Sequence, residues 1–226
     1  MIYIFLICII VLLVFAPQWW VKYVMKQHDK HIKDLPGTGG ELAQHLIERY
    51  QLPVTLEITD TGDHYDPQTK TVRLSEAYYN GKSLTSIAIA AHEVGHAIQD
   101  FRNDEMLILR GKMVIVSQRF QKFGAATLFI APILGAFIRS PLAGVFIALI
   151  GILSIASSVV VHIISLPVEF DASFNKALPL LVEGEYMTQR DLIAIRQVLL
   201  AAALTYVAAA LSSLLNVWRW IAILRR

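Results

Sequence analysis

The sequence predicts a mainly α-helical integral membrane protein with about four transmembrane helices and a small polar α+β portion. Hydrophobic residues make up 55% of the 226 residues and only 17% are charged, which is too apolar for an ordinary soluble domain. The apolar residues gather in a few long runs separated by polar stretches. One of these stretches contains two short segments that alternate between polar and apolar residues, the pattern of half-buried strands. Together these features predict membrane-crossing helices and a small sheet outside the membrane.

Three parts of the chain are apolar enough to enter a membrane. We expect a transmembrane anchor at 1–22, a polar portion at 23–122, a membrane hairpin at 123–166, a polar segment at 167–192, and a last transmembrane helix with the C-terminus at 193–226. The anchor lacks a basic N-terminal region and a small-residue cleavage site, so we expect it to be retained. The first arm of the hairpin is short and contains a proline, which predicts a tilted or incomplete span.

The polar portion begins with a predicted helix and two predicted strands. Thr38 and Glu41 have the spacing of a capping box, which predicts the start of a helix. The alternating segments 54–60 and 70–74 predict two strands, with a turn at 66–69 before the second. Such a sheet could bind an extended peptide at its edge as an added strand. Alternatively, the strands only pack against the helix that follows, and the sequence does not separate the two.

A metal-binding motif lies within a predicted helix over residues 84–100. His92 and His96 are four residues apart, so they lie one turn apart on one helical face and can bind one cation. Imidazole nitrogens at this spacing suit Zn²⁺, and Glu93 is placed to take a proton from a metal-bound water. A chance pattern is the alternative. An apolar helix is nevertheless a poor place for two histidines and a carboxylate without partners.

A tetrahedral zinc site needs a third protein ligand besides two histidines and a water. Glu169 is the leading candidate, because two membrane crossings separate it from His96 and return it to the same side. Pro167 would bend the end of this helix and turn Glu169 toward the metal. We expect Asp171 to support the ligands, although both carboxylates could simply lie near a helix end. His162, on the same helical face as Glu169, is better suited to an interhelical hydrogen bond than to a fourth ligand.

These motifs resemble those of a known family. The resemblance is carried by the His92–His96 motif, the segments 63–67, 72–75 and 166–173, and the layout of the spans. In these features the chain resembles the YugP-like family of membrane-bound neutral zinc metallopeptidases. The resemblance covers nearly the whole chain and implies a glutamate-zincin peptidase with a zincin-like catalytic portion at 23–122. It also implies a distant similarity to membrane proteases related to the CAAX prenyl protease. In those relatives an aspartate four positions after the glutamate ligand supports a histidine ligand. Here that position is Ser173, and the aspartate is displaced to Asp171.

The predicted reaction is hydrolysis of a peptide bond by a metal-activated water. His92, His96 and Glu169 would hold Zn²⁺, while Glu93 would act as the general base and later protonate the leaving amine. The transition state would need a further hydrogen-bond donor. The sequence leaves four candidates unranked: His64, Tyr65, Arg73 and Asn175.

Three other functions compete with a surface peptidase. A site-2-type intramembrane protease also places this motif on an apolar helix, but it would need a ligand aspartate in a Leu-Asp-Gly-like segment, which the chain lacks. A di-iron protein would use Glu-x-x-His on two helices, and only Glu93 with His96 fits that pattern. A non-catalytic zinc-binding scaffold is the third alternative, although every group required for catalysis is present.

Charge and composition limit the expected partners. The net charge is only +2 and no basic run is interleaved with aromatic residues, so we expect no nucleic acid. The expected partners are a lipid bilayer and a peptide or membrane-protein substrate, and the oligomeric state stays open. Lysines follow the first span and none precedes it, which predicts a multi-pass protein of the cell membrane with its catalytic portion in the cytoplasm, although arginines after the last span conflict with this side. Cys8 is the single cysteine, so no intramolecular disulfide can form.

Overall fold

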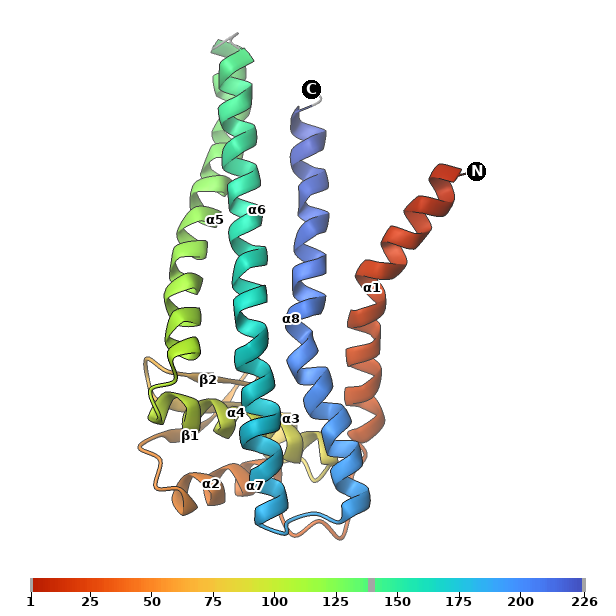
Figure 1. Ribbon diagram of the computed structural model, residues 1–226, viewed down its shortest axis with the longest axis vertical. Coiled ribbons are helices and arrows are strands. Elements are labelled where there is room, and N and C mark those ends of the chain that lie inside the picture. The colour runs from red at the N-terminus through yellow and green to blue at the C-terminus, as the bar shows by residue number, and fades with distance from the viewer. Residues whose placement is uncertain (1, 138–140, 225–226) are drawn as a thin grey trace. The chain divides into compact units, whose positions relative to one another are not determined.

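Helices dominate the structure, a computed structural model, and a small sheet accompanies them (Figure 1). Residues 2–137 and 141–224 are described, with side chains described for residue 12 and for 14–127, 130, 145–147, 149–154 and 156–212. The chain forms two compact units. The long-helix unit contains Met1–Ala16, Leu109–Ser165 and Tyr206–Arg226, and the sheet unit contains Pro17–Ile108 and Leu166–Thr205.

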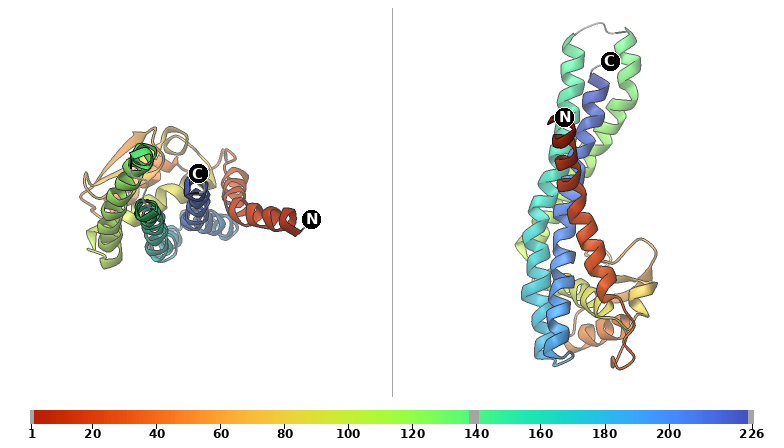
Figure 2. Two further views of the ribbon diagram at one scale, coloured as in Figure 1. Left: turned by 90° about the horizontal axis from the view of Figure 1, so that it is seen from above. Right: turned by 90° about the vertical axis from the view of Figure 1, so that its right-hand side faces the viewer.

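Four long helices account for most of the chain. They are α1 (Ile2–His28), α5 (Glu105–Phe137), α6 (Pro141–Phe170) and α8 (Gln189–Leu224). Within the long-helix unit, α5, α6 and α8 lie side by side (Figure 2). A hydrogen bond of 3.1 Å between Ser117 Oγ and Ser157 Oγ joins α5 to α6, and Arg110 on α5 donates to the Tyr206 hydroxyl on α8. Such polar pairs hold together helices whose surfaces are otherwise apolar.

Two helical stretches among the described residues are long and apolar enough to cross a membrane, rather than the predicted four. They are Val145–Glu183 and Gln189–Ser212. The predicted anchor falls mostly on residues whose side chains lie outside the described set. The short first arm of the predicted hairpin is part of α5 as far as Phe137, and α5 begins at Glu105. Lysine and arginine side chains in the first half of α5 leave no apolar stretch of membrane-spanning length among its described residues.

The sheet unit begins with the end of α1 and continues into α2 (Gly39–Arg49). The predicted capping box at the start of α2 is confirmed. Thr38 Oγ1 accepts a hydrogen bond from the Glu41 N–H at 3.2 Å, and the Glu41 carboxylate accepts one from the Thr38 N–H at 2.7 Å. These two bonds satisfy N–H groups that the first turn of a helix leaves without a helical partner.

The sheet has three strands, one more than predicted. Its strands are β1 (Thr55–Thr59), β2 (His64–Asp66) and β3 (Thr71–Ser75), in the order β1-β3-β2. β1 runs parallel to β3, and β2 runs antiparallel to it. β2 is only three residues long, too short for an alternating pattern to stand out in the sequence.

The core of the sheet unit lies between the inner face of the sheet and the following helices. Val72 and Leu74 on β3 are fully buried and belong to the same apolar cluster as side chains of α2 and α4 (Leu84–Phe101). A short helix, α3 (Glu76–Tyr79), connects β3 to α4. Residues 84–99 of α4 are all buried, so this helix is the centre of the unit.

The chain stays helical beyond residue 166, where the predicted membrane hairpin ends. Pro167 lies inside α6, which continues into a π-helical segment, η1 (Asp171–Ala177), and then α7 (Leu178–Glu183). The polar segment predicted at 167–192 is therefore mostly helix. A proline cannot donate the usual backbone hydrogen bond, and π-helical turns occur often at functional sites.

Candidate metal centre

The helix α4 carries three ionisable residues in the middle of the sheet unit. Ser83 caps its start, because the Ser83 hydroxyl accepts a hydrogen bond from the Ser86 N–H at 3.0 Å. Alanines and other small residues then let α4 pack closely on its neighbours. His92, Glu93 and His96 expose only 4–6% of their surface. Groups of this kind need polar partners when they are buried.

Gly95 allows the π-helical segment η1 to approach α4. A Cβ at position 95 would lie 2.7 Å from the Ala172 carbonyl oxygen, closer than real side chains come to backbone. Glycine is therefore required between the two histidines for a reason of packing. The close approach brings Glu169, at the end of α6, next to the histidine face of α4.

The three predicted ligands meet at one point. Glu169 Oε2 lies 3.1 Å from His92 Nε2 and 3.3 Å from His96 Nε2. The two imidazole rings stand edge to face, with centroids 4.7 Å apart. One ligand atom from each of the three residues lies within 4.8 Å of the others, and all three residues are buried. This is the one group of metal-binding type among the described residues.

Gln99 fixes the tautomer of His96. The Gln99 amide nitrogen donates to the Val168 carbonyl oxygen at 2.9 Å and to Asp171 Oδ2 at 2.8 Å. Both partners can only accept, so the amide oxygen of Gln99 must be the atom that faces His96 Nδ1 at 2.9 Å. His96 Nδ1 therefore carries a proton, and Nε2 of a neutral His96 presents its lone pair.

Ser173 does the same for His92. The Ser173 hydroxyl donates to the Leu199 carbonyl oxygen at 3.2 Å, so its oxygen accepts from His92 Nδ1 at 3.1 Å. Ser173 occupies the position at which the resemblance implies an aspartate. In this chain a hydroxyl that is anchored to the backbone of α8 supports the histidine instead.

Asp171 lies beside the centre and contacts Gln99, not the histidines. Its carboxylate accepts hydrogen bonds from Gln99, from Asn175 at 2.9 Å and from Lys176 at 2.8 Å. The contact with His96 is thus indirect, through Gln99. Sequence reasoning missed Gln99, although it lies three residues after His96 on the same helical face.

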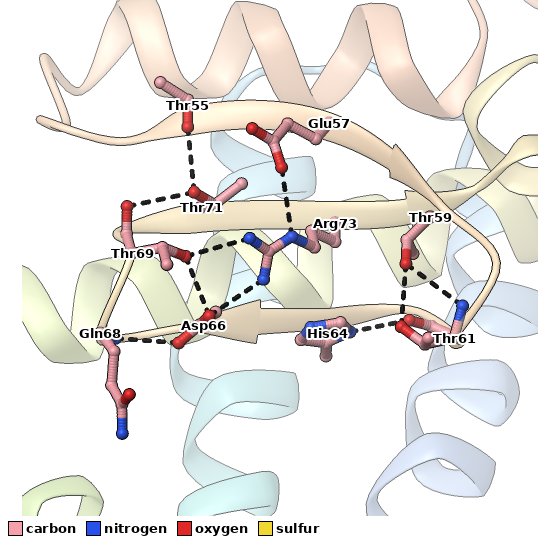
Figure 3. Close-up of polar contacts among 11 residues, drawn as sticks. Thr55, Glu57, Thr59, Thr61, His64, Asp66, Gln68, Thr69, Thr71 and Arg73 are labelled. Atoms are coloured by element: carbon pink, nitrogen blue, oxygen red, sulfur yellow. Dashed lines mark hydrogen bonds and ion pairs between the residues drawn. The ribbon is translucent and has the colours of Figure 1, made fainter.

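The four candidate oxyanion donors all have other partners. Arg73 lies on the outer face of the sheet and donates to Asp66 at 2.9 Å and to Glu57 at 3.2 Å (Figure 3). That face is opposite to Val72 and Leu74, which pack toward α4.

The other three candidates are engaged as well. His64 Nδ1 donates to the Gly62 carbonyl oxygen at 2.8 Å (Figure 3), and Asn175 binds Asp171. The Tyr65 hydroxyl donates to Asp100, and burial together with this bond raises the pKa of Tyr65 well above its usual value.

His162 is not part of the group of ligands. Its ring packs against that of Tyr206 with centroids 6.0 Å apart, and both residues belong to the long-helix unit. His162 Nδ1 is buried and has no hydrogen-bond partner among the described residues. The interhelical hydrogen bond expected for His162 is not found among the described residues, and a ring contact with Tyr206 joins α6 to α8 instead.

A family model described as "Putative neutral zinc metallopeptidase" matches residues 3–225. The chain belongs to this family. The "Putative membrane protease YugP" of Bacillus subtilis (strain 168) is 35% identical over 226 residues, which cover 99% of this chain and 96% of the relative. No solved structure matches the fold. The two buried histidines and the buried glutamate are a group that could hold the zinc ion named in the family's description.

Proposed function

We propose that the protein is a membrane-embedded zinc metallopeptidase that hydrolyses peptide bonds with Glu93 as the general base. The observation that carries the proposal is the meeting of three electron-pair donors in a buried site. Both Nδ1 atoms donate hydrogen bonds elsewhere, so each imidazole, when it carries a single proton, presents the lone pair of Nε2 to a carboxylate oxygen. Three such atoms repel one another unless a positive charge lies among them. A metal cation supplies that charge.

The chemistry of the three donors suits Zn²⁺. Two imidazole nitrogens and one carboxylate oxygen are the protein ligands of well-known catalytic zinc sites, which keep a fourth position open for water. When bound here, Zn²⁺ would supply a Lewis acid that polarises the scissile carbonyl and lowers the pKa of a water. Glu169 as the third ligand supports the glutamate-zincin arrangement over the site-2-type arrangement.

Glu93 is the residue that we assign to proton transfer. It follows His92 directly in α4 and is 6% exposed. One of its carboxylate oxygens would accept a proton from the attacking water and then deliver it to the leaving amine nitrogen. His92 and His96 hold their positions meanwhile, because Ser173 and Gln99 bind the Nδ1 atoms of their rings.

Replacement of Glu93 by glutamine tests the proposal. Glu93→Gln keeps the shape of the side chain but cannot act as a base, so we expect full zinc content and a loss of cleavage of about 10²–10⁴-fold. Zinc is measured by elemental analysis of the purified protein, and cleavage by mass spectrometry of proteins in the same membranes. Glu57→Gln, on the outer face of the sheet, is the matched control and should behave as wild type. Equal cleavage by wild type and Glu93→Gln would favour the non-catalytic scaffold instead.

We also propose that the protein crosses the cell membrane several times and that the sheet unit faces the cytoplasm. Lys22 and Lys26 in the last turns of α1, and Lys30 and Lys33 just after it, are exposed, and such residues favour the inner side. In Cys8→Ser protein, a cysteine at exposed position Glu48 should resist a membrane-impermeant thiol reagent in intact cells and react after permeabilisation. Reaction in intact cells would place the sheet unit outside.

A further inference from the structure

A cluster of large exposed aromatic residues lies on α1 within the sheet unit. Trp19, Trp20 and Tyr23 expose 40–65% of their surface. Lys22 and Lys26, on the same two turns, are exposed as well. Tryptophan and tyrosine gather where a membrane meets water, because their rings are apolar and each carries one polar group, and lysines bind the headgroups next to them. The cluster on α1 therefore has the composition of a segment at a membrane surface.

A second group of exposed apolar residues lies where α4 ends and α5 begins. Phe101, Met106 and Ile108 expose 41–54% of their surface, and all three belong to the sheet unit. Arg102, between them, is exposed too. Exposed apolar side chains next to a cation again fit the boundary between lipid and water.

The helix that carries the metal ligands is held between these two groups. At its start, the Thr85 hydroxyl donates to the Met25 carbonyl oxygen of α1 at 2.9 Å. Met25 is two residues beyond Tyr23, about 3 Å further along the helix. At its other end, α4 finishes at Phe101 itself. Within the sheet unit, α4 runs crosswise to the neighbouring parts of α1 and α8 (Figure 1).

The beginning of α8 also changes from polar to apolar residues. Arg190, Arg196 and Gln197 are exposed, and from Val198 the helix becomes apolar. Leu199 is the first residue after this change whose backbone carbonyl contacts the metal centre. Its carbonyl oxygen accepts a hydrogen bond from Ser173. The support of His92 thus comes from the turn at which α8 changes from polar to apolar.

We propose that α4 lies along the membrane–water interface, and that the metal centre therefore acts on the segments of membrane proteins that directly flank their transmembrane helices. This inference rests on the peptidase function proposed above. The headgroup region is roughly 5–8 Å thick on each side of the hydrocarbon core. An extended chain advances about 3.3 Å per residue. A substrate held in the same membrane would therefore present its first few residues beyond the bilayer to His92, His96 and Glu169.

The depth of α4 in the membrane can be measured without any activity. In Cys8→Ser protein, nitroxide labels are placed singly at Trp20→Cys and Phe101→Cys, with Asp60→Cys in the loop after β1 as the control. The proteins are reconstituted in vesicles of phosphatidylcholine and phosphatidylglycerol, and relaxation by oxygen is compared with relaxation by a water-soluble nickel chelate. We expect the first two labels at one depth, in the headgroup region, and the control in water. Labels at Trp20 and Phe101 that are as accessible to the chelate as the control would overturn the interfacial position. Depths of the two labels that differ by more than about 10 Å would overturn it too, because α4 would then be steeply tilted to the membrane surface.

The substrate class is tested by the position of new chain ends. Membranes from cells with wild type or Glu93→Gln are compared for protein N-termini that only the wild type creates. We expect these termini within about five residues of a transmembrane helix. Termini spread through soluble domains would overturn the substrate class but not the peptidase. Identical termini in both samples would overturn the peptidase and the substrate class with it, while the labels still decide whether α4 is interfacial.

Discussion

The metal centre and the outer face of the sheet are two polar networks of similar composition in opposite surroundings. At the metal centre, Glu169 lies between two histidines and is 2% exposed. On the sheet, Arg73 lies between Glu57 and Asp66, and the Glu57 side chain is 52% exposed (Figure 3). Both networks bring together residues from different elements around at least one carboxylate. They differ in whether water can replace a hydrogen-bond partner that is removed.

This difference separates a functional network from a structural one. A buried polar group that loses its partner keeps the full cost of its removal from water, whereas an exposed group binds water instead. Exposed ion pairs therefore contribute little to stability. Buried clusters of ionisable groups are typical of functional sites, and here three donors converge on one point.

The largest expected effect comes from breaking the buried network. Glu169→Ala should abolish zinc binding and peptidase activity, because the site keeps only two protein ligands. Glu57→Ala, on the sheet, should bind zinc fully and change the free energy of unfolding by no more than about 1 kcal/mol. Elemental analysis and thermal unfolding of both purified proteins make the comparison. Near-stoichiometric zinc in Glu169→Ala would remove this residue from the set of ligands.

The residues behind the ligands should have the next largest effect. Gln99→Leu and Ser173→Ala should each weaken zinc binding by about 10–100-fold, because they release a histidine from its fixed tautomer. Asp171→Ala should act in the same direction and more weakly, since it reaches His96 only through Gln99. Competition with a chelator measures the affinity.

The exposed Gln44 provides the control for this series. Its amide binds Glu48 on the surface of α2 at 2.6 Å, so Gln44→Leu removes a comparable hydrogen bond away from the site. Zinc affinity should be unchanged in this variant. If Gln99→Leu folds and binds zinc as tightly as Gln44→Leu, the assigned role of Gln99 is wrong.

Two glycines sharpen the comparison between buried and exposed positions. Gly95→Ala should destabilise the protein by about 1–3 kcal/mol, since the new Cβ would press on the Ala172 carbonyl. Gly111, on α5, has nothing within 4 Å of an added Cβ. Gly111→Ala should therefore be neutral or stabilise by up to about 1 kcal/mol, the difference in helix propensity. Thermal unfolding in detergent distinguishes them, and equal stability of the two variants would contradict the close contact at Gly95.

The smallest expected effect is a dependence on pH at the sheet. The Gln68 backbone N–H, with the Arg73 and Thr69 side chains, lowers the pKa of Asp66 to about 2, although burial acts the other way. A carboxyl whose pKa is lowered on folding stabilises the folded state above the unfolded pKa, and this contribution disappears as the pH falls through the folded pKa. Asp66→Asn should therefore be less stable than wild type by up to about 1 kcal/mol at neutral pH.

The difference between Asp66→Asn and wild type should fade as the pH falls from about 4 to about 2. Denaturant unfolding at a series of pH values measures it. Asp60→Asn, an exposed substitution in the loop after β1, should give a small difference that does not vary with pH over this range. A difference for Asp66→Asn that persists at the lowest pH would show that its cause is not the ionised carboxylate.

Local features of the sequence were enough to predict local features of the structure. The capping box of Thr38 and Glu41 depends on residues three apart, and it forms as predicted. The helix that carries His92 and His96 follows from spacing and composition in the same way. The family was also evident from motifs, and the comparisons confirm it. Among the described residues only two stretches are long and apolar enough to cross a membrane, and the other two predicted spans fall largely on residues whose side chains are not described.

What the sequence by itself determined is which groups the chain offers: two histidines on one helical face, a glutamate beyond an apolar helix, and serine in place of aspartate at position 173. Only the tertiary structure decided how these groups are held. The contact of Ser173 with His92 joins residues 81 positions apart, and Gln99 joins α4 to the backbone of Val168, 69 positions away. Such partners leave no periodic signal in the chain, because a hydrogen bond between distant segments depends on how close the backbones come. At this site that approach depends on Gly95, whose missing side chain lets η1 reach α4.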